Sequence, residues 1–152
     1  MENTKIDAFN LVGISTVTTN ANGQAAKDIG DLLNRFMGEG IATKIPNKLS
    51  EEVYSVYTDY EGDYTNPYRV LMGCKVSSLD EIPEGLEGRT IGGGQFVKFV
   101  AKGDLARGAV YNEWVKIWDT ELDRAYQADF EIYGAKAQDP SNAEVDIFIG
   151  VR

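Results

Sequence analysis

The sequence predicts an α+β domain made of two β-α-β-β units that are related by pseudo-twofold symmetry. Stretches with strand and helix character follow in the same order in two halves of the chain, residues 8–76 and residues 89–152. The run LMGCK at residues 71–75 has a weak echo, FIGVR, at residues 148–152. A chain of 152 residues is long enough for one core, so we expect a single domain over residues 1–152.

The first half begins with a strand and a helix. Residues 8–18 are rich in β-branched side chains, which is typical of a strand. Over residues 24–37, apolar side chains recur at i, i+3, i+4 and i+7, which indicates an amphipathic helix. These side chains are Ile29, Leu32, Leu33 and Phe36. Two strands, at residues 53–60 and 68–76, complete the half.

The second half repeats this order after a charged loop at residues 77–88. A strand at residues 95–101 precedes a helix over residues 105–122, which Asp104 is suited to cap. One broad face of that helix is apolar and consists of Val110, Tyr111, Trp114, Val115, Trp118 and Leu122. Two strands, at residues 129–135 and 144–151, end the half. Two such halves side by side leave a central groove, which is a natural ligand site.

The charge balance argues against nucleic-acid binding. Fifteen Lys and Arg residues face 24 Asp and Glu residues, which gives a net charge of −9. Proteins that bind DNA draw much of their affinity from cations that neutralise phosphates, and no basic stripe is visible here. The acidic field instead favours cationic small molecules or a basic partner.

Missing residue types remove several kinds of chemistry. The chain has no histidine and one cysteine, Cys74, which excludes a Ser–His–Asp triad, a zinc cluster and an intrachain disulfide. Residues 59–70 have the acidic spacing of a calcium loop, but Tyr64 and Val70 stand where Gly and Glu are needed. We therefore expect neither a metal nor a cofactor. A lone cysteine, the absence of a long apolar run and the absence of a signal segment at residues 1–7 predict a cytoplasmic protein without a membrane span.

The stretch of residues 128–134 carries the least ordinary feature of the sequence. Phe130 and Ile132 point to one face, and Asp129, Glu131 and Tyr133 point to the other. Pattern alone favours a solvated face for Glu131. If that face is buried, the carboxylate needs a partner, and a positively charged ligand is one candidate.

Aromatic residues are dense elsewhere in the chain. Five tyrosines fall within the first pair of strands and their turn: Tyr54, Tyr57, Tyr60, Tyr64 and Tyr68. Many of them need no functional explanation, because tyrosine is a good strand residue. The tryptophans of the second helix, four residues apart, are more typical of a core. Aromatic walls beside a carboxylate are nevertheless what binds flat lipophilic cations.

Several of these runs carry a family resemblance. They are Val56-Tyr57-Thr58-Asp59-Tyr60-Glu61 with Tyr68, Pro83-Glu84-Gly85-Leu86, the stretch from Ile91 to Phe99, the pair Trp114 and Trp118, and Asp129-Phe130-Glu131-Ile132-Tyr133. In order and spacing they resemble the GyrI-like family of bacterial effector-binding domains. Such domains also form the ligand-sensing half of AraC- and MerR-type multidrug regulators. The resemblance spans about residues 9–152.

The resemblance implies a duplicated SH2-like β-α-β-β fold with a central ligand cleft. It implies that Glu131 pairs with amphipathic, cationic lipophilic compounds between aromatic side chains. By strand face or helix face it places six aromatic residues at that site: Tyr57, Tyr68, Phe96, Trp114, Trp118 and Tyr133. The chain has no room for a helix-turn-helix domain, so we expect a stand-alone binding protein.

Two other hypotheses stay open beside ligand binding. Proteins similar to this family hydrolyse strained electrophiles, and Glu131 could then activate water while Tyr133 or Tyr57 donates a proton to the leaving group. Alternatively, the acidic surface engages a protein partner, as gyrase-inhibitor members of the family do. We favour binding over catalysis because the sequence shows no second catalytic group.

Overall fold

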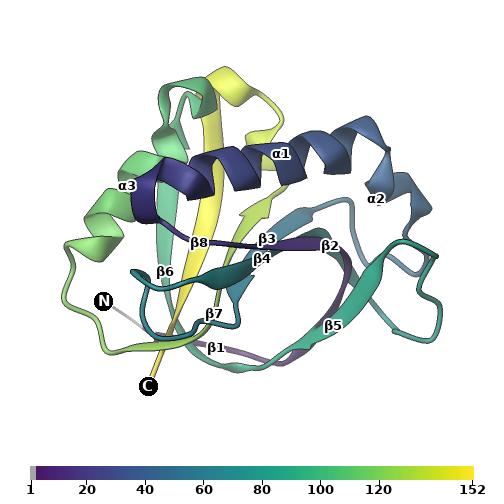
Figure 1. Cartoon of the computed structure of the whole chain (residues 1–152), viewed down its shortest axis with the longest axis horizontal. Coiled ribbons are helices and arrows are strands. Elements are labelled where there is room, and N and C mark those ends of the chain that lie inside the picture. The colour runs from purple at the N-terminus through teal and green to yellow at the C-terminus, as the bar shows by residue number, and fades with distance from the viewer. Residues whose placement is uncertain (1–2) are drawn as a thin grey trace.

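A computed structural model describes residues 3–152 (Figure 1), so Met1 and Glu2 of the expected domain lie outside the described residues. The strands are β1 (Asn3–Ile6), β2 (Phe9–Thr18), β3 (Val53–Thr58), β4 (Tyr68–Val76), β5 (Glu87–Ile91), β6 (Gly94–Gly103), β7 (Arg124–Tyr133) and β8 (Ala143–Val151). The α-helices are α1 (Gln24–Gly38), α2 (Ile41–Lys44) and α3 (Ala109–Trp118). Within residues 3–152, no helix is long and apolar enough to cross a membrane.

All eight strands join one curled antiparallel sheet in the order β1-β6-β8-β7-β3-β4-β2-β5. The two predicted units are β2-α1-β3-β4 and β6-α3-β7-β8. Their strands are arranged symmetrically about the central pairing of β3 with β7, and β5 and β1 extend the two outer ends in the same way. The predicted duplicated α+β fold is confirmed.

Both long helices cover the same face of the sheet (Figure 1). Under α1 lies a core that includes Phe36 of the helix and Met72 of β4. Under α3 lies a second core, in which Ile117 of the helix packs against Ile147 of β8. The other face of the curled sheet holds a third, aromatic core, which contains Phe9, Tyr54, Phe96, Phe130 and Phe148. The middle of the sheet, which carries the site described below, is therefore packed against cores on both of its faces.

Three strands differ from expectation, and one of them is the edge strand β5, which begins within the loop predicted over residues 77–88. The strand predicted at residues 129–135 begins earlier, at Arg124, and its pairing with β8 shifts register between Arg124 and Asp129. In the irregular segment before Asp129 the side chains do not follow the period-2 alternation on which the prediction rested, so the sequence did not reveal the earlier start of the strand. At the edge, β1 was not predicted, because its residues Asn3–Ile6 are mostly exposed and form the strand by backbone pairing with β6.

The second helix is also shorter than expected. It was predicted over residues 105–122, but α3 covers only Ala109–Trp118. Asp104 does cap the preceding turn, where its carboxylate accepts the Ala106 backbone N–H at 2.9 Å. Gly108 then takes a left-handed conformation at φ +81°, which separates that turn from the helix.

Strands β2 and β4 approach closely where two glycines face each other. Gly13 pairs with Gly73, and a Cβ atom added to Gly13 would lie 1.8 Å from the Met72 carbonyl oxygen. A Cβ atom on Gly73 would lie 2.2 Å from the Val12 carbonyl oxygen. Both positions therefore require glycine.

Candidate functional site

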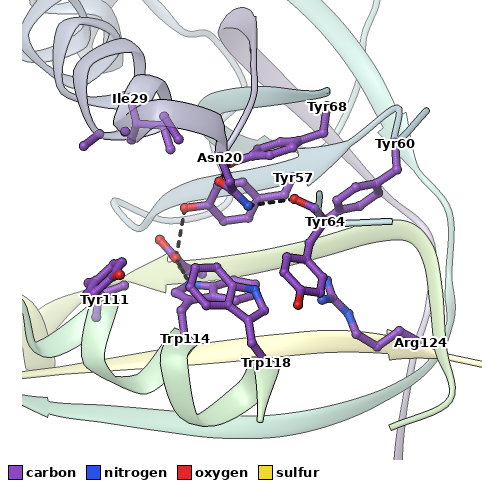
Figure 2. Close-up of a pocket in the computed structure, with 15 residues that line it drawn as sticks. Asn20, Ile29, Tyr57, Tyr60, Tyr64, Tyr68, Tyr111, Trp114, Trp118 and Arg124 are labelled. Carbon is purple, nitrogen blue, oxygen red and sulfur yellow. Dashed lines mark hydrogen bonds between the residues drawn. The ribbon is translucent and has the colours of Figure 1, made fainter. Parts of the chain in front are cut away.

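A cavity of 470 Å³ opens between the two long helices, above the central pair of strands. This volume lies within the range of about 300–1,000 Å³ that is typical of small-molecule sites. Figure 2 shows aromatic rings on several sides of it. Its lining residues are Asn20, Gly23, Ala25, Ala26, Ile29, Tyr57, Tyr60, Tyr64, Tyr68, Val110, Tyr111, Trp114, Trp118, Arg124 and Glu131. Because the cavity lies where the two halves meet, each half contributes to its wall.

Glu131 lies at the floor of the cavity, and its side chain is buried, with 1% of the residue exposed. Three neutral groups hold its carboxylate. Trp114 Nε1 and the Tyr57 hydroxyl donate to Oε2, at 2.6 and 2.9 Å, and the Tyr133 hydroxyl donates to Oε1 at 2.7 Å. The burial that the alternation pattern left open is thus real, and it depends on α3, which places Trp114 over the strand.

Burial raises the pKa of Glu131 above its ordinary value of 4.5, and the three hydrogen bonds oppose that shift. The pKa values of Tyr57 and Tyr133 rise well above 10, chiefly through burial and also through the nearby Glu131 charge. Both tyrosines therefore stay protonated and act as donors. A carboxylate in this environment is ionised at a cost in free energy.

The neighbouring carboxylate, Asp129, is stabilised in a different way. It is fully buried and accepts three hydrogen bonds, from Arg124 Nη2 at 2.7 Å, the Gly150 backbone N–H at 2.8 Å and the Tyr60 hydroxyl. Burial raises the pKa of Asp129, and the Arg124 guanidinium opposes the rise. Of these two buried carboxylates, only Asp129 has a cation beside it: no Lys or Arg among residues 3–152 forms an ion pair with Glu131.

Aromatic rings form the walls. The rings of Tyr57 and Trp114 meet edge to face, with centroids 5.5 Å apart, directly beside the Glu131 carboxylate. At the rim, Tyr64 stacks on Trp118 at 5.5 Å with an interplanar angle of 14°. Such rings offer electron-rich faces to a cation.

The structure brings five of the seven predicted site residues to the cavity: Glu131, Tyr57, Tyr68, Trp114 and Trp118. Tyr133 does not line it, but its hydroxyl holds the Glu131 carboxylate from the side. The prediction that Phe96 belongs to the site is wrong, because Phe96 does not line the cavity. It is 3% exposed and packs edge to face on Phe130 in the core of the opposite sheet face.

Several lining residues were not assigned to the site from the sequence. Tyr60 and Tyr64 belonged to the noted tyrosine cluster, so their density was a usable signal. Asn20 connects two walls: its side-chain amide donates to the Tyr64 carbonyl at 2.9 Å, and its oxygen accepts from the Tyr68 hydroxyl at 2.6 Å. Arg124 had no signal, because it lay in a predicted connection. Within the described part of the chain, no group of three or more acidic or cysteine side chains is placed to hold a metal ion.

The fold and the cavity together define a small-molecule-binding domain of the effector-binding type. The chain belongs to the family of integron-associated effector binding proteins, Cass2, whose pattern matches residues 4–151. The resemblance to GyrI-like effector-binding domains is thereby confirmed.

Three known proteins place the chain further. It is 28% identical to an integron cassette protein from the mobile metagenome of Vibrio cholerae, whose structure has a TM-score of 0.76 and covers 99% of this chain and 95% of that one. SAV2435, solved bound to tetraphenylphosphonium, shares the fold at 15% identity, with a TM-score of 0.80 over 99% of this chain and 93% of that one. YobU of Bacillus subtilis, named as a transcriptional regulator, is 22% identical over 153 residues, 98% of this chain and 96% of YobU.

Proposed function

We propose that this protein binds amphipathic, lipophilic cations in the central cavity and that Glu131 selects for their positive charge. The single observation that carries this proposal is the buried Glu131 carboxylate, which neutral donors hold and no cation of residues 3–152 accompanies. A buried charge without an opposite charge is costly. A bound cation would remove that cost, and the free energy recovered in this way would add to the affinity for the cation.

The hydrogen bonds at Glu131 also favour a particular kind of cation. Three of the lone-pair directions of the carboxylate are already taken by Trp114, Tyr57 and Tyr133. A compact ammonium or metal ion needs oxygen ligands to replace its water shell, and few remain here. A bulky cation with a diffuse charge needs only proximity, and it gains from contact with aromatic faces.

Three further features support this proposal. The lining is mainly aromatic and aliphatic, and Glu131 and Arg124 are its only charged members. The chain carries a net charge of −9, which raises the local concentration of cations. SAV2435, which has the same fold, was solved with tetraphenylphosphonium, so this ion is a suitable first probe.

The experiment is a titration with tetraphenylphosphonium followed by tryptophan fluorescence. The chain has two tryptophans, Trp114 and Trp118, and both line the cavity, so quenching reports directly on its occupancy. Glu131→Gln is expected to weaken binding about ten- to a hundredfold, since two unit charges about 6 Å apart interact by about 2.8 kcal/mol at an effective dielectric constant of about 20. The control is Glu51→Gln, whose side chain is 87% exposed and outside the cavity. Unchanged affinity in Glu131→Gln would contradict the proposal.

The geometry favours binding over hydrolysis by the same glutamate. Tyr57 and Tyr133, the two candidates for proton donation to a leaving group, both give their O–H to Glu131 itself. We therefore expect incubation with a reactive cyclopropane or an activated ester to yield no enzyme-dependent product by mass spectrometry. Turnover that Glu131→Gln abolishes would instead support the hydrolase. The protein-interaction hypothesis stays a prediction, to be checked by a gyrase inhibition assay.

A further inference from the structure

The cavity contains a second polar group that the proposed function does not use. Arg124 lines it from β7, and the residue is only 6% exposed. Its Nη2 atom donates to Asp129, but its Nε and Nη1 atoms are buried and have no hydrogen-bond partner. Arginine has five N–H groups and cannot lose its charge, so donors on two of its nitrogens stay unused.

The backbone of β7 next to Arg124 has an unusual conformation. The register of β7 against β8 shifts between Arg124 and Asp129, so Arg124 lines the cavity from an irregular part of its strand. Within the shifted segment, Tyr126 adopts a left-handed conformation at φ +53°, which is uncommon for a bulky residue. Its ring lies over the guanidinium, with 4.4 Å between Cζ and the ring centroid. Strain of this kind persists where a particular geometry is needed.

Trp114 is close to both polar groups. Its indole nitrogen donates to Glu131 at 2.6 Å, and its ring centroid is 6.0 Å from Arg124 Cζ. Glu131 and Arg124 therefore both lie near the same indole ring. One ligand with a cationic centre and an aromatic arm can reach both.

We propose that Arg124 forms a second subsite that accepts a neutral hydrogen-bond acceptor of the ligand, such as a carbonyl or ether oxygen. The preferred ligand is thus a lipophilic monocation with an acceptor on an aromatic arm. This proposal rests on the proposed function, because the cation at Glu131 anchors the ligand.

A neutral acceptor fits better than a carboxylate because the charge of Arg124 is already matched. Asp129 accepts from the same guanidinium, at 2.7 Å, so a ligand carboxylate there would approach a buried carboxylate of the protein. Taken together, Glu131, Asp129 and Arg124 carry one net negative charge. A monocation balances that charge, and a zwitterion does not.

The Tyr64 ring covers part of this subsite. Its ring centroid is 6.0 Å from Arg124 Cζ, and Figure 2 shows the Tyr64 ring beside the guanidinium. Tyr64 belongs to the connection between β3 and β4, outside any strand or helix, and its ring stacks on Trp118. A ligand that places its acceptor in this subsite would have to displace the Tyr64 ring to reach Nε and Nη1.

The test uses phosphonium ions that differ in one group. Triphenylphosphonium ions with an acetylphenyl fourth arm, in the meta and para forms, are compared with the isopropylphenyl analogues, which have nearly the same shape and no acceptor. The better acetyl isomer is expected to bind wild type about ten- to a hundredfold more tightly than its isopropyl partner, the usual worth of a hydrogen bond to a charged donor. The carboxyphenyl analogue is expected to bind more weakly than the acetyl one.

The decisive variant is Arg124→Met/Asp129→Asn, which removes the buried ion pair as a unit and should bring the acetyl-to-isopropyl ratio to about one. Arg124→Lys, which keeps a cation for Asp129 and loses the guanidinium fork, serves if the double variant does not fold, and it should at least halve the ratio. The matched control is Arg89→Met/Asp59→Asn, a partly exposed ion pair outside the cavity, which should keep the wild-type ratio.

The outcomes separate the two proposals. If wild type binds tetraphenylphosphonium but shows equal affinity for the acetyl and isopropyl ions, the acceptor subsite is wrong and the cation site stands. A preference that survives in every folded Arg124 variant, or tighter binding of the carboxyphenyl ion, also overturns the subsite. If tetraphenylphosphonium and its derivatives all fail to bind wild type, both proposals fall.

Discussion

Replacing Glu131 by glutamine is expected to make the folded protein more stable at neutral pH. The residue is 1% exposed, and burial raises the pKa of its carboxyl above 4.5 in spite of three hydrogen bonds. A raised folded-state pKa means that the ionised form is disfavoured by folding. Glutamine has nearly the same shape and no charge. Its carbonyl can accept from Trp114 and Tyr57, and its amide can donate to the Tyr133 hydroxyl oxygen.

The expected size follows from the linkage between protonation and folding. Each unit by which the folded-state pKa exceeds the unfolded value contributes about 1.4 kcal/mol of instability above the folded pKa. We expect Glu131→Gln to raise the free energy of unfolding by about 1–3 kcal/mol at pH 7.5, which is the usual cost of burying a polar group whose hydrogen bonds only partly replace those to water. As pH falls through 4.5, the ordinary pKa of the group, Glu131 becomes protonated in the unfolded state as well, so the difference should fall toward zero. As pH rises through the folded pKa, wild type loses stability relative to the variant.

Urea unfolding of both proteins at several pH values between 4 and 8 measures this difference. Carboxyls with lowered pKa, such as Asp59 beside Arg89, add a pH dependence of the opposite sign, but it is common to both proteins and cancels. Glu51→Gln, a change at an exposed side chain, should show no such gap. A Glu131→Gln protein that is less stable than wild type at pH 7.5, or a gap that does not change with pH, would refute the reasoning.

Three further outcomes are expected. The affinity of wild type for tetraphenylphosphonium should fall as pH is lowered through the pKa of Glu131, because protonation removes the selecting charge. The affinity of Glu131→Gln should not change with pH, and calorimetric titrations between pH 5 and 8 check both expectations. Phe96→Leu should lower the free energy of unfolding by about 1 kcal/mol and leave affinity for the same ion unchanged, since Phe96 packs in the opposite core; a weakened affinity would return Phe96 to the site. Gly13→Ala should cost more than about 2 kcal/mol, since the new Cβ meets the Met72 carbonyl, and an unchanged melting temperature would argue against the β2–β4 register.

The duplicated fold was predictable because each half carries its own local signals. The helix of the first half shows its apolar period in Ile29, Leu32, Leu33 and Phe36, and the structure places α1 over Gln24–Gly38. By contrast, the edge strand β1 has no apolar pattern, since its residues lie at the surface and only the backbone pairs. Register shifts and edge pairing depend on partners far away in sequence, which a local period cannot reveal.

The site was predictable in part. The alternation in β7 put Glu131 on the correct face, but its burial comes from Trp114, which another element supplies. Phe96 was assigned to the cavity by strand face. Along β6 its side chain points to the face opposite that of Phe99, and Phe99 packs in the core under α3. Phe96 therefore packs in the aromatic core on the other face of the sheet. Arg124 was missed because it precedes the regular part of its strand. What failed in each case was the step from a residue's neighbours in sequence to its neighbours in space.

One comparison tests the central claim most directly: tetraphenylphosphonium against tetraphenylborate, two ions of nearly the same size and shape with opposite charge, titrated into wild-type protein by calorimetry. If the buried charge of Glu131 selects the ligand, the phosphonium binds, the borate shows no measurable binding, and Glu131→Gln narrows the gap between them. Equal affinity for the two ions, or a preference for the borate, would show that the cavity selects by shape alone and would contradict the account.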